Sequence, residues 1–252
     1  MSESIGIWAE SYNVNVYDAD INGRLKITAL CNYMQNTAWL HYREIEKIKG
    51  AMLKKGHIWA MIRLEAVIYS TAHWGGCLKV MTWSRNVGKL SAFRDYEVSD
   101  SKGKRIAGAT ATWVVIDPLT KDIQSLKGVS DKWPEQRDQS ALGRDAGKAP
   151  GVVNPYSSVE FKVRFGEFDV NRHVNNVAYI DWMNESLSRD YLENHELRSL
   201  KVNFLEEVQY NGHVTVLTEE KAHNSFACSV LNKETGRESA RGLFTFSAVT
   251  GL

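Results

Sequence analysis

The sequence predicts an α+β protein made of two similar halves, and three observations support this prediction. Each half opens with alternating apolar residues, continues with one segment that can form a helix, and ends with several strand-like segments. Identical residues recur at matching places in the two halves. A stretch rich in Pro, Gly and polar residues lies between them. One helix followed by a run of strands favours an antiparallel sheet packed on that helix.

The expected elements follow the same order in both halves. The opening strands are expected at 8–16 and 159–165, where apolar and polar side chains alternate. The helical segments are expected from Ile27 to Lys49 and from Asn176 to Asn194. The later strands, four in each half, are expected at 59–69, 77–87, 91–98 and 108–116, and then at 200–208, 213–222, 225–231 and 242–249.

The recurring residues indicate an internal duplication. Four residues recur 149 positions later, within a window of fifteen in which roughly one match is expected by chance: Asp20 as Asp169, Asn22 as Asn171, Ala29 as Ala178 and Met34 as Met183. Farther along, Phe93, Gly103 and Ala107 recur 133 positions later as Phe226, Gly236 and Ala240. We therefore expect a first half at 1–125, a linker at 126–157 and a second half at 158–252.

Composition excludes several classes of protein. The 252 residues include 31 Lys plus Arg and 30 Asp plus Glu, so no net charge points to nucleic acid. Three widely spaced cysteines argue against a disulfide framework and a zinc site, so we expect reduced thiols and no metal. The sequence contains no Gly-rich phosphate loop, so we expect no cofactor. No segment has the pattern of a signal peptide or of a membrane span. These features favour a cytoplasmic protein.

Three polar residues lie where the second half passes from its opening strand to its helix. His173 can accept or donate a proton near neutral pH, and the Asp169 carboxylate can orient the imidazole, attack a thioester or activate water. The Asn171 amide can donate a hydrogen bond to a developing oxyanion. The same residue types also close turns and cap helices, so this spacing by itself is a weak signal.

The longer run from Asp169 to Trp182, DVNRHVNNVAYIDW, resembles the signature of the acyl-ACP thioesterases. That signature joins D-x-N-x-H to V-N-N-x-x-Y and a Trp three residues on. The resemblance implies a double hot-dog fold, in which each half wraps a curved antiparallel sheet around one long helix. It also implies that Asp169, Asn171 and His173 are catalytic.

The resemblance further implies a catalytic Glu after the helix, usually followed by Cys. Glu207 is the better match, and Val208 stands where the Cys would be, which argues against a cysteine nucleophile. Neighbouring Glu206 leaves an ambiguity of one residue, because successive strand residues face opposite sides. In the first half Arg24 replaces the histidine, so we expect one site, in the second half, and a first half that holds the acyl chain.

An acyl chain needs an apolar tunnel, in which each CH₂ contributes about 0.8 kcal/mol. Candidates to line it are apolar and aromatic residues of the first half, although such residues at helical spacing are usually core: Tyr33, Met34, Thr37, Trp39, Trp59 and Met61. The resemblance implies an acidic acyl carrier protein as partner. Basic residues that could dock it are Arg63, Lys79, Arg85, Lys89, Arg94, Arg172, Arg198 and Lys201.

The expected function is hydrolysis of medium- or long-chain fatty acyl thioesters of acyl carrier protein. Either His173 and Glu207 activate water, or Asp169 attacks directly to give an anhydride, and the sequence does not separate these routes. Alternatives are an acyl-CoA thioesterase, a hydratase or dehydratase of the same fold, and a non-catalytic acyl-binding protein. Either a monomer or a homodimer is expected.

Overall fold

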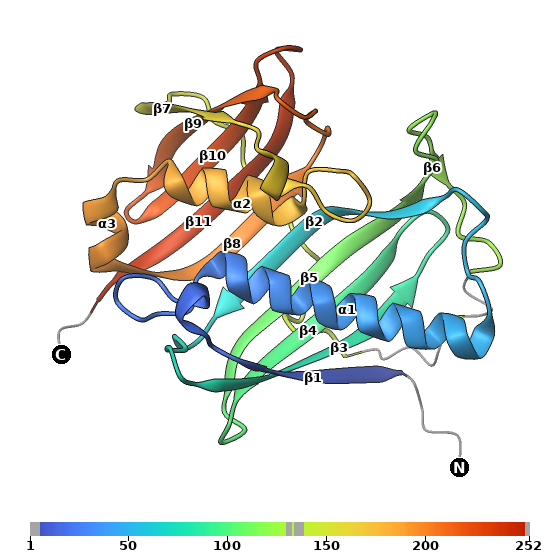
Figure 1. Ribbon diagram of the computed structural model, residues 1–252. Helices are drawn as coiled ribbons and strands as arrows, with labels where there is room; N and C mark the ends of the chain where they lie inside the picture. The colour runs from blue at the N-terminus through green and yellow to red at the C-terminus, as the bar shows by residue number, and fades with distance from the viewer. Residues whose placement is uncertain (1–5, 130–132, 134–138, 250–252) are drawn as a thin grey trace. The chain divides into compact units, whose positions relative to one another are not determined.

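The protein is described by a computed structural model that covers residues 6–129, 133 and 139–249. The chain divides into two compact units, Met1–Ala146 and Gly147–Leu252, so the division falls inside the expected linker. Each unit consists of an antiparallel sheet with a helix against one face (Figure 1). Among the described helices, none combines the length and apolar character needed to cross a membrane.

Unit 1 contains a sheet with the strand order β1-β3-β4-β5-β2, and every pair in it is antiparallel. A two-residue strand, β6, pairs with the end of β5 and is not expected from the sequence. The elements are β1 (Ile7–Asn13), the 3-10 turn η1 (Val16–Asp18), α1 (Ile27–Lys49), β2 (Ile58–Ile68), β3 (Cys77–Val87), β4 (Ala92–Asp100), β5 (Arg105–Ile116) and β6 (Ile123–Gln124).

Helix α1 begins and ends where the sequence predicts. It lies across one face of the sheet and packs against β1 and β3 (Figure 1). Its buried side chains recur every three or four positions, as a helix with one apolar face requires; they include Leu30, Met34, Ala38, His41 and Ile45. Gly50 ends the helix with a positive φ of 75°, and its N–H donates to the Glu46 carbonyl at 2.9 Å.

Unit 2 repeats this plan with the strand order β7-β9-β10-β11-β8, again antiparallel throughout. Helix α2 lies against β9, β10 and β11 (Figure 1). The elements are β7 (Ser157–Lys162), the 3-10 turn η3 (Phe165–Glu167), α2 (Asn176–Glu185), α3 (Arg189–Asn194), β8 (His195–Phe204), β9 (His213–Ala222), β10 (Ser225–Asn232) and β11 (Glu238–Ala248).

The prediction of a single helix from Asn176 to Asn194 is wrong in one respect, because the segment is broken into α2 and α3. Two serines cause the break, since their hydroxyls compete for backbone hydrogen bonds. The Ser186 hydroxyl donates to the Met183 carbonyl at 2.7 Å. The Ser188 hydroxyl accepts the Tyr191 N–H at 3.2 Å and so caps a new helix.

The end of the strand expected at 200–208 also differs. Strand β8 stops at Phe204, and the backbone N–H groups of Leu205 and Glu206 both donate to the Ser239 carbonyl, at 2.8 and 3.1 Å. Two consecutive donors on one acceptor are incompatible with a regular ladder. Strand alternation therefore does not determine which way Glu206 and Glu207 point.

The described residues 139–146 of the expected linker lie on the sheet of unit 1. The Ala141 N–H donates at 2.8 Å to the carboxylate of Asp95, which is fully buried on β4. The Arg144 guanidinium pairs at 2.6 Å with Glu65, buried on β2. Buried carboxylates need such partners because desolvation otherwise penalises their charge. These bonds hold the segment against unit 1.

We predict that Gly242→Ala destabilises unit 2 by about 1–3 kcal/mol, because β11 approaches α2 closely at this position. A Cβ there would lie 2.7 Å from the Met183 sulfur and 3.0 Å from Phe244. Chemical denaturation would measure the change, with Gly166→Ala as the control, since a Cβ at Gly166 meets nothing within 4 Å. Equal stability of the two variants would contradict the prediction and show that Met183 moves aside at little cost.

Candidate active site

The turn from Asp169 to His173 is closed by hydrogen bonds among its own residues. The Asp169 N–H donates to the His173 carbonyl at 2.9 Å, and the Arg172 N–H donates to the Asp169 carbonyl at 3.0 Å. The Asp169 carboxylate oxygen Oδ1 accepts the N–H groups of Asn171 at 2.8 Å and His173 at 3.4 Å. Arg172 has a positive φ of 64°, which reverses the chain. The turn therefore projects Asn171 and His173 from a closed backbone.

Helix α2 holds the turn at its other end. The Asn175 side chain accepts the Val177 N–H at 3.0 Å and caps the helix. The Asn175 N–H donates to the Glu167 carbonyl at 2.8 Å, across the turn. Trp182, buried on α2, donates its indole N–H to the Glu167 carboxylate at 3.1 Å. The turn thus has fixed anchors on both sides.

His173 and Glu207 lie side by side although they come from different elements. Their Nε2 and Oε1 atoms are 3.6 Å apart, and their side chains are 30% and 24% exposed. This distance is longer than a hydrogen bond, but such contacts commonly shorten when substrate binds. The pair is therefore half-buried, accessible to a ligand, and close enough to share a proton directly or through one water.

Glu207, rather than Glu206, is the carboxylate beside the histidine. Glu206 is paired at 3.8 Å with Arg237, a side chain that is mostly exposed. After Glu207 the chain is anchored again, because the buried Val208 donates its N–H to the Tyr179 hydroxyl on α2 at 3.1 Å. The geometry therefore favours Glu207, as the resemblance in sequence does.

Two of the three cysteines are buried thiols. Desolvation raises the pKa of Cys31 to about 12 and that of Cys228 to about 11. Neither forms an appreciable amount of thiolate near neutral pH, and the thiolate is the nucleophilic form. Cys77 is exposed at the start of β3, far in sequence from the turn. Together with Val208 beside Glu207, these positions favour carboxylate and imidazole chemistry.

Unit 1 contains the same turn without the histidine. Asp20 closes it, accepting the N–H groups of Asn22 at 2.9 Å and Arg24 at 2.8 Å. The Arg24 guanidinium turns back onto the Asp20 carboxylate and forms an ion pair at 2.8 Å. This turn therefore presents a neutralised ion pair where unit 2 presents an imidazole.

The residues proposed to line a tunnel are not gathered in one place. Tyr33, Met34 and Thr37 are buried on α1, where the Tyr33 hydroxyl donates to the Asn13 carbonyl at 3.2 Å. The Thr37 hydroxyl donates to the Tyr33 carbonyl at 2.8 Å. Trp39 is 48% exposed, and Arg43 lies 5.1 Å from its ring centre. Tyr33, Met34 and Thr37 thus share the buried face of α1, whereas Trp39 lies on its exposed side.

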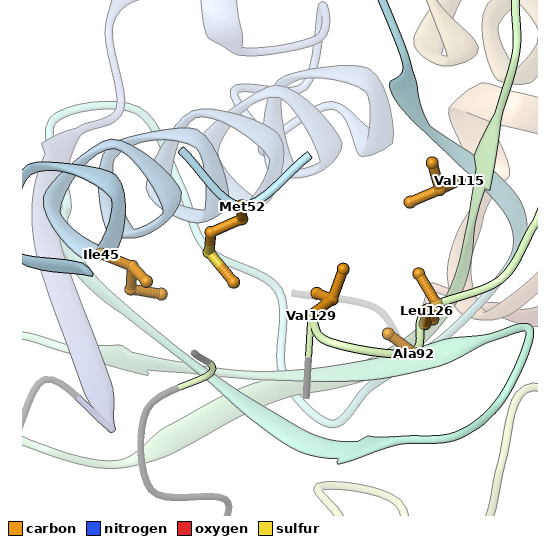
Figure 2. Close-up of a cluster of buried hydrophobic side chains, with 6 residues drawn as sticks. All are labelled: Ile45, Met52, Ala92, Val115, Leu126 and Val129. Atoms are coloured by element: carbon orange, nitrogen blue, oxygen red, sulfur yellow. The ribbon is translucent and has the colours of Figure 1, made fainter. Parts of the chain in front are cut away.

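Trp59 and Met61 are partly buried on β2. Trp59 packs against the apolar cluster at the C-terminal end of α1, formed by Ile45, Met52, Ala92, Val115, Leu126 and Val129 (Figure 2). A cavity of about 280 Å³ adjoins this cluster, with Met52, Leu53 and Val129 in its wall and Lys54, His57 and Lys127 as its basic residues. Sequence reasoning missed this cavity because most of its wall comes from loops, which have no periodic pattern.

Among the basic residues suggested for docking, Arg94 and Arg85 bind partners within unit 1. The prediction that Arg94 could dock a partner is wrong, because its guanidinium is buried against His41 Nδ1 at 3.0 Å and the Thr82 hydroxyl at 3.2 Å. Arg85 forms ion pairs with Asp95, at 2.9 Å, and with Asp145. Within the described part of the chain, no group of three or more His, Cys, Asp or Glu side chains could hold a metal ion.

Comparison with known proteins gives a consistent result in both halves. The family model described as the acyl-ACP thioesterase N-terminal domain matches residues 6–129, and that of the C-terminal domain matches residues 153–248. Oleoyl-acyl carrier protein thioesterase 2 of Arabidopsis thaliana is 28% identical over 91% of this chain and 66% of its own length. The palmitoyl-acyl carrier protein thioesterase of Gossypium hirsutum is 28% identical over 94% and 62%. The chain thus spans slightly less than two thirds of these relatives.

Solved structures confirm the double hot-dog fold. An acyl-ACP thioesterase from Bacteroides thetaiotaomicron matches with a TM-score of 0.85 and 22% identity, over 98% of this chain and 100% of the other. The 12:0-ACP thioesterase from Umbellularia californica matches with a TM-score of 0.84 and 18% identity, over 96% and 97%. At these identities the matches establish the fold alone.

We predict that only Cys77 of the native protein reacts with N-ethylmaleimide, because burial keeps Cys31 and Cys228 in the unreactive thiol form. Intact-mass measurement should give one adduct on the folded protein and three after denaturation, one for each cysteine of the chain. The control variant Cys77→Ser should take up no label while folded. Rapid modification of Cys31 or Cys228 in the native protein would contradict this assignment.

Proposed function

The chain belongs to the acyl-ACP thioesterase family, and from this membership we propose that it hydrolyses fatty acyl thioesters of acyl carrier protein. The observation that carries the proposal is the contact between His173 and Glu207 at 3.6 Å, with Asn171 on the same closed turn as His173. A base, a carboxylate and an amide donor are the groups that thioester hydrolysis needs. The curated relatives named above are acyl carrier protein thioesterases, which supports the same substrate class.

In the proposed reaction, oxygen attacks the thioester carbonyl, and the C–S bond of the tetrahedral intermediate then breaks. The Asn171 amide donates a hydrogen bond to the oxyanion, where a preorganised donor lowers the barrier. His173 accepts a proton as the nucleophile attacks and delivers it to the departing sulfur. The products are a free fatty acid and the thiol of the carrier. The attacking oxygen belongs to water or to Asp169.

The alternatives remain distinguishable by product and substrate. A hydratase or dehydratase of this fold leaves the thioester intact, so it releases no thiol. An acyl-binding protein without activity binds the acyl chain equally well when His173 is replaced. An acyl-CoA thioesterase performs the same chemistry on another carrier. A cytoplasmic location, and a monomeric or homodimeric state, stay predictions from the sequence.

We predict that His173→Ala and Glu207→Gln each lower kcat by about 10²- to 10⁴-fold, the usual contribution of a general acid–base group. Release of free thiol from acyl carrier protein thioesters measures the effect. Glu206→Gln is the matched control, because this carboxylate pairs with Arg237 and should leave kcat within about threefold of wild type. Full activity of folded His173→Ala would exclude the proposed role.

We also predict a preference for acyl carrier protein over CoA when the same acyl chain is offered on both. Steady-state kcat/KM values should differ by at least about tenfold, which corresponds to about 1.4 kcal/mol of differential transition-state binding. The preference should weaken at high salt, because an acidic carrier and basic residues attract one another through a screened field. Equal kcat/KM values for the two carriers would favour the acyl-CoA alternative.

A further inference from the structure

We propose that Asp169 is a positioning residue that closes the turn, and that Glu207 is the carboxylate that assists proton transfer by His173. The inference rests on the proposed thioester hydrolysis and specifies its nucleophile as water. The inference derives from a comparison of the two units. Both contain the same turn and the same segment after a strand, but the residues at one position of each differ.

The two turns have the same hydrogen bonds. In unit 1 the Asp20 N–H donates to the Arg24 carbonyl at 2.8 Å, and in unit 2 the Asp169 N–H donates to the His173 carbonyl at 2.9 Å. The Oδ1 atom of each Asp accepts two backbone N–H groups, from the second and the fourth residue after it. Each turn is also flanked by an isolated bridge, Ala19 with Leu25 and Phe168 with Val174.

The segments after β2 and β8 correspond just as closely. The N–H groups of Tyr69 and Ser70 share the Ile106 carbonyl at 2.8 and 3.2 Å, as those of Leu205 and Glu206 share the Ser239 carbonyl. Farther on, the Val14 N–H donates to the Gly76 carbonyl, and the Val163 N–H donates to the Gly212 carbonyl, both at 2.9 Å. The residue that follows each shared-acceptor pair is Thr71 in unit 1 and Glu207 in unit 2.

This correspondence separates scaffold from chemistry. Unit 1 keeps the Asp and the Asn but has Arg24 and Thr71 where unit 2 has His173 and Glu207. Asp20 closes its turn in a unit that lacks both proton-transfer groups, so closure of the turn alone accounts for an Asp at this position. His173 and Glu207, whose positions in unit 1 hold other residue types, are the two side chains that lie 3.6 Å apart.

The bonding of the Asp169 carboxylate also disfavours attack. Its Oδ1 accepts two backbone N–H groups, and its Oδ2 accepts the Asn171 side-chain amide at 3.4 Å. Attack by Oδ1 on a substrate carbon would break the two backbone hydrogen bonds that close the turn. Asp169 therefore acts through the backbone of the turn, which its Oδ1 holds closed.

Water then supplies both the attacking oxygen and the proton that the leaving sulfur receives. His173 accepts one proton from water while the water oxygen bonds to the thioester carbon, and the Glu207 carboxylate stabilises the imidazolium. The C–S bond breaks, the sulfur takes the proton from His173, and the fatty acid keeps the oxygen of water. The Asp169 carboxylate forms and breaks no covalent bond.

Two substitutions of Asp169 test the inference. Asp169→Asn keeps an oxygen that can accept the turn's N–H groups but cannot act as a nucleophile, so kcat should stay within about tenfold of wild type. Asp169→Ala removes the acceptor, so kcat should fall at least about 100-fold. Release of thiol from acyl carrier protein thioesters measures both. Equal losses in the two variants, or no loss in either, would overturn the inference.

Unit 1 offers matched controls. Asp20→Ala and Asp169→Ala should both lower the melting temperature, while the two Asn variants should melt close to wild type, because each turn needs only the acceptor oxygen. Asp20→Ala should keep wild-type kcat. The pH profile of kcat should be unchanged in Asp169→Asn and changed in Glu207→Gln, which a merely structural Glu207 would not produce. An altered profile in Asp169→Asn with an unaltered one in Glu207→Gln would overturn the assignment.

Failure of the proposed function gives a different result. A wild-type protein that releases no thiol refutes the hydrolysis, and the inference with it. An active wild-type enzyme with Asp169→Asn as inactive as Asp169→Ala refutes the inference alone.

Discussion

The carboxylate of Asp169 accepts the backbone N–H groups of Asn171 and His173, and the position of the imidazole depends on these two hydrogen bonds. Ordering a residue of an open turn costs about 1–2 kcal/mol of backbone entropy, which such bonds help to offset. Neither His173 nor Glu207 is buried enough for packing alone to hold it. The cap at Asn175 therefore has a functional consequence, because it anchors the turn to α2.

The duplication shows what the fold needs and what the chemistry needs. Both units keep the same turn, the same shared acceptor after the strand and the same helix against the sheet. Unit 1 has Arg24 where unit 2 has the histidine, and Arg24 forms an ion pair with the Asp that closes the turn. Unit 1 lacks the base but has the scaffold, since the backbone bonds to Asp20 are present. The fold of the turn therefore does not depend on the histidine.

The buried charged side chains Asp95, Glu65 and Arg94 of unit 1 each have a hydrogen-bonding partner. Asp95 and Glu65 hold the segment before Gly147 against the sheet, through Ala141 and Arg144. Arg94, suggested for docking, instead bonds to His41 between α1 and the sheet. Alternation along β4 predicts that Arg94 shares a face with other buried residues, but no local pattern reveals that His41 meets it. Charged residues are therefore the least predictable from sequence.

The sequence by itself determined the duplication, the bounds of α1, the start of α2 and the turn motif, because periodicity and capping are local properties. It did not predict the break at Ser186 and Ser188, where hydroxyl groups outcompete a continuous apolar pattern. Only the tertiary structure brought Glu207, and not Glu206, beside His173, and only there did the Asp169 carboxylate appear engaged by its own turn. Both facts depend on where β8 ends and on which distant groups meet, which no local pattern contains.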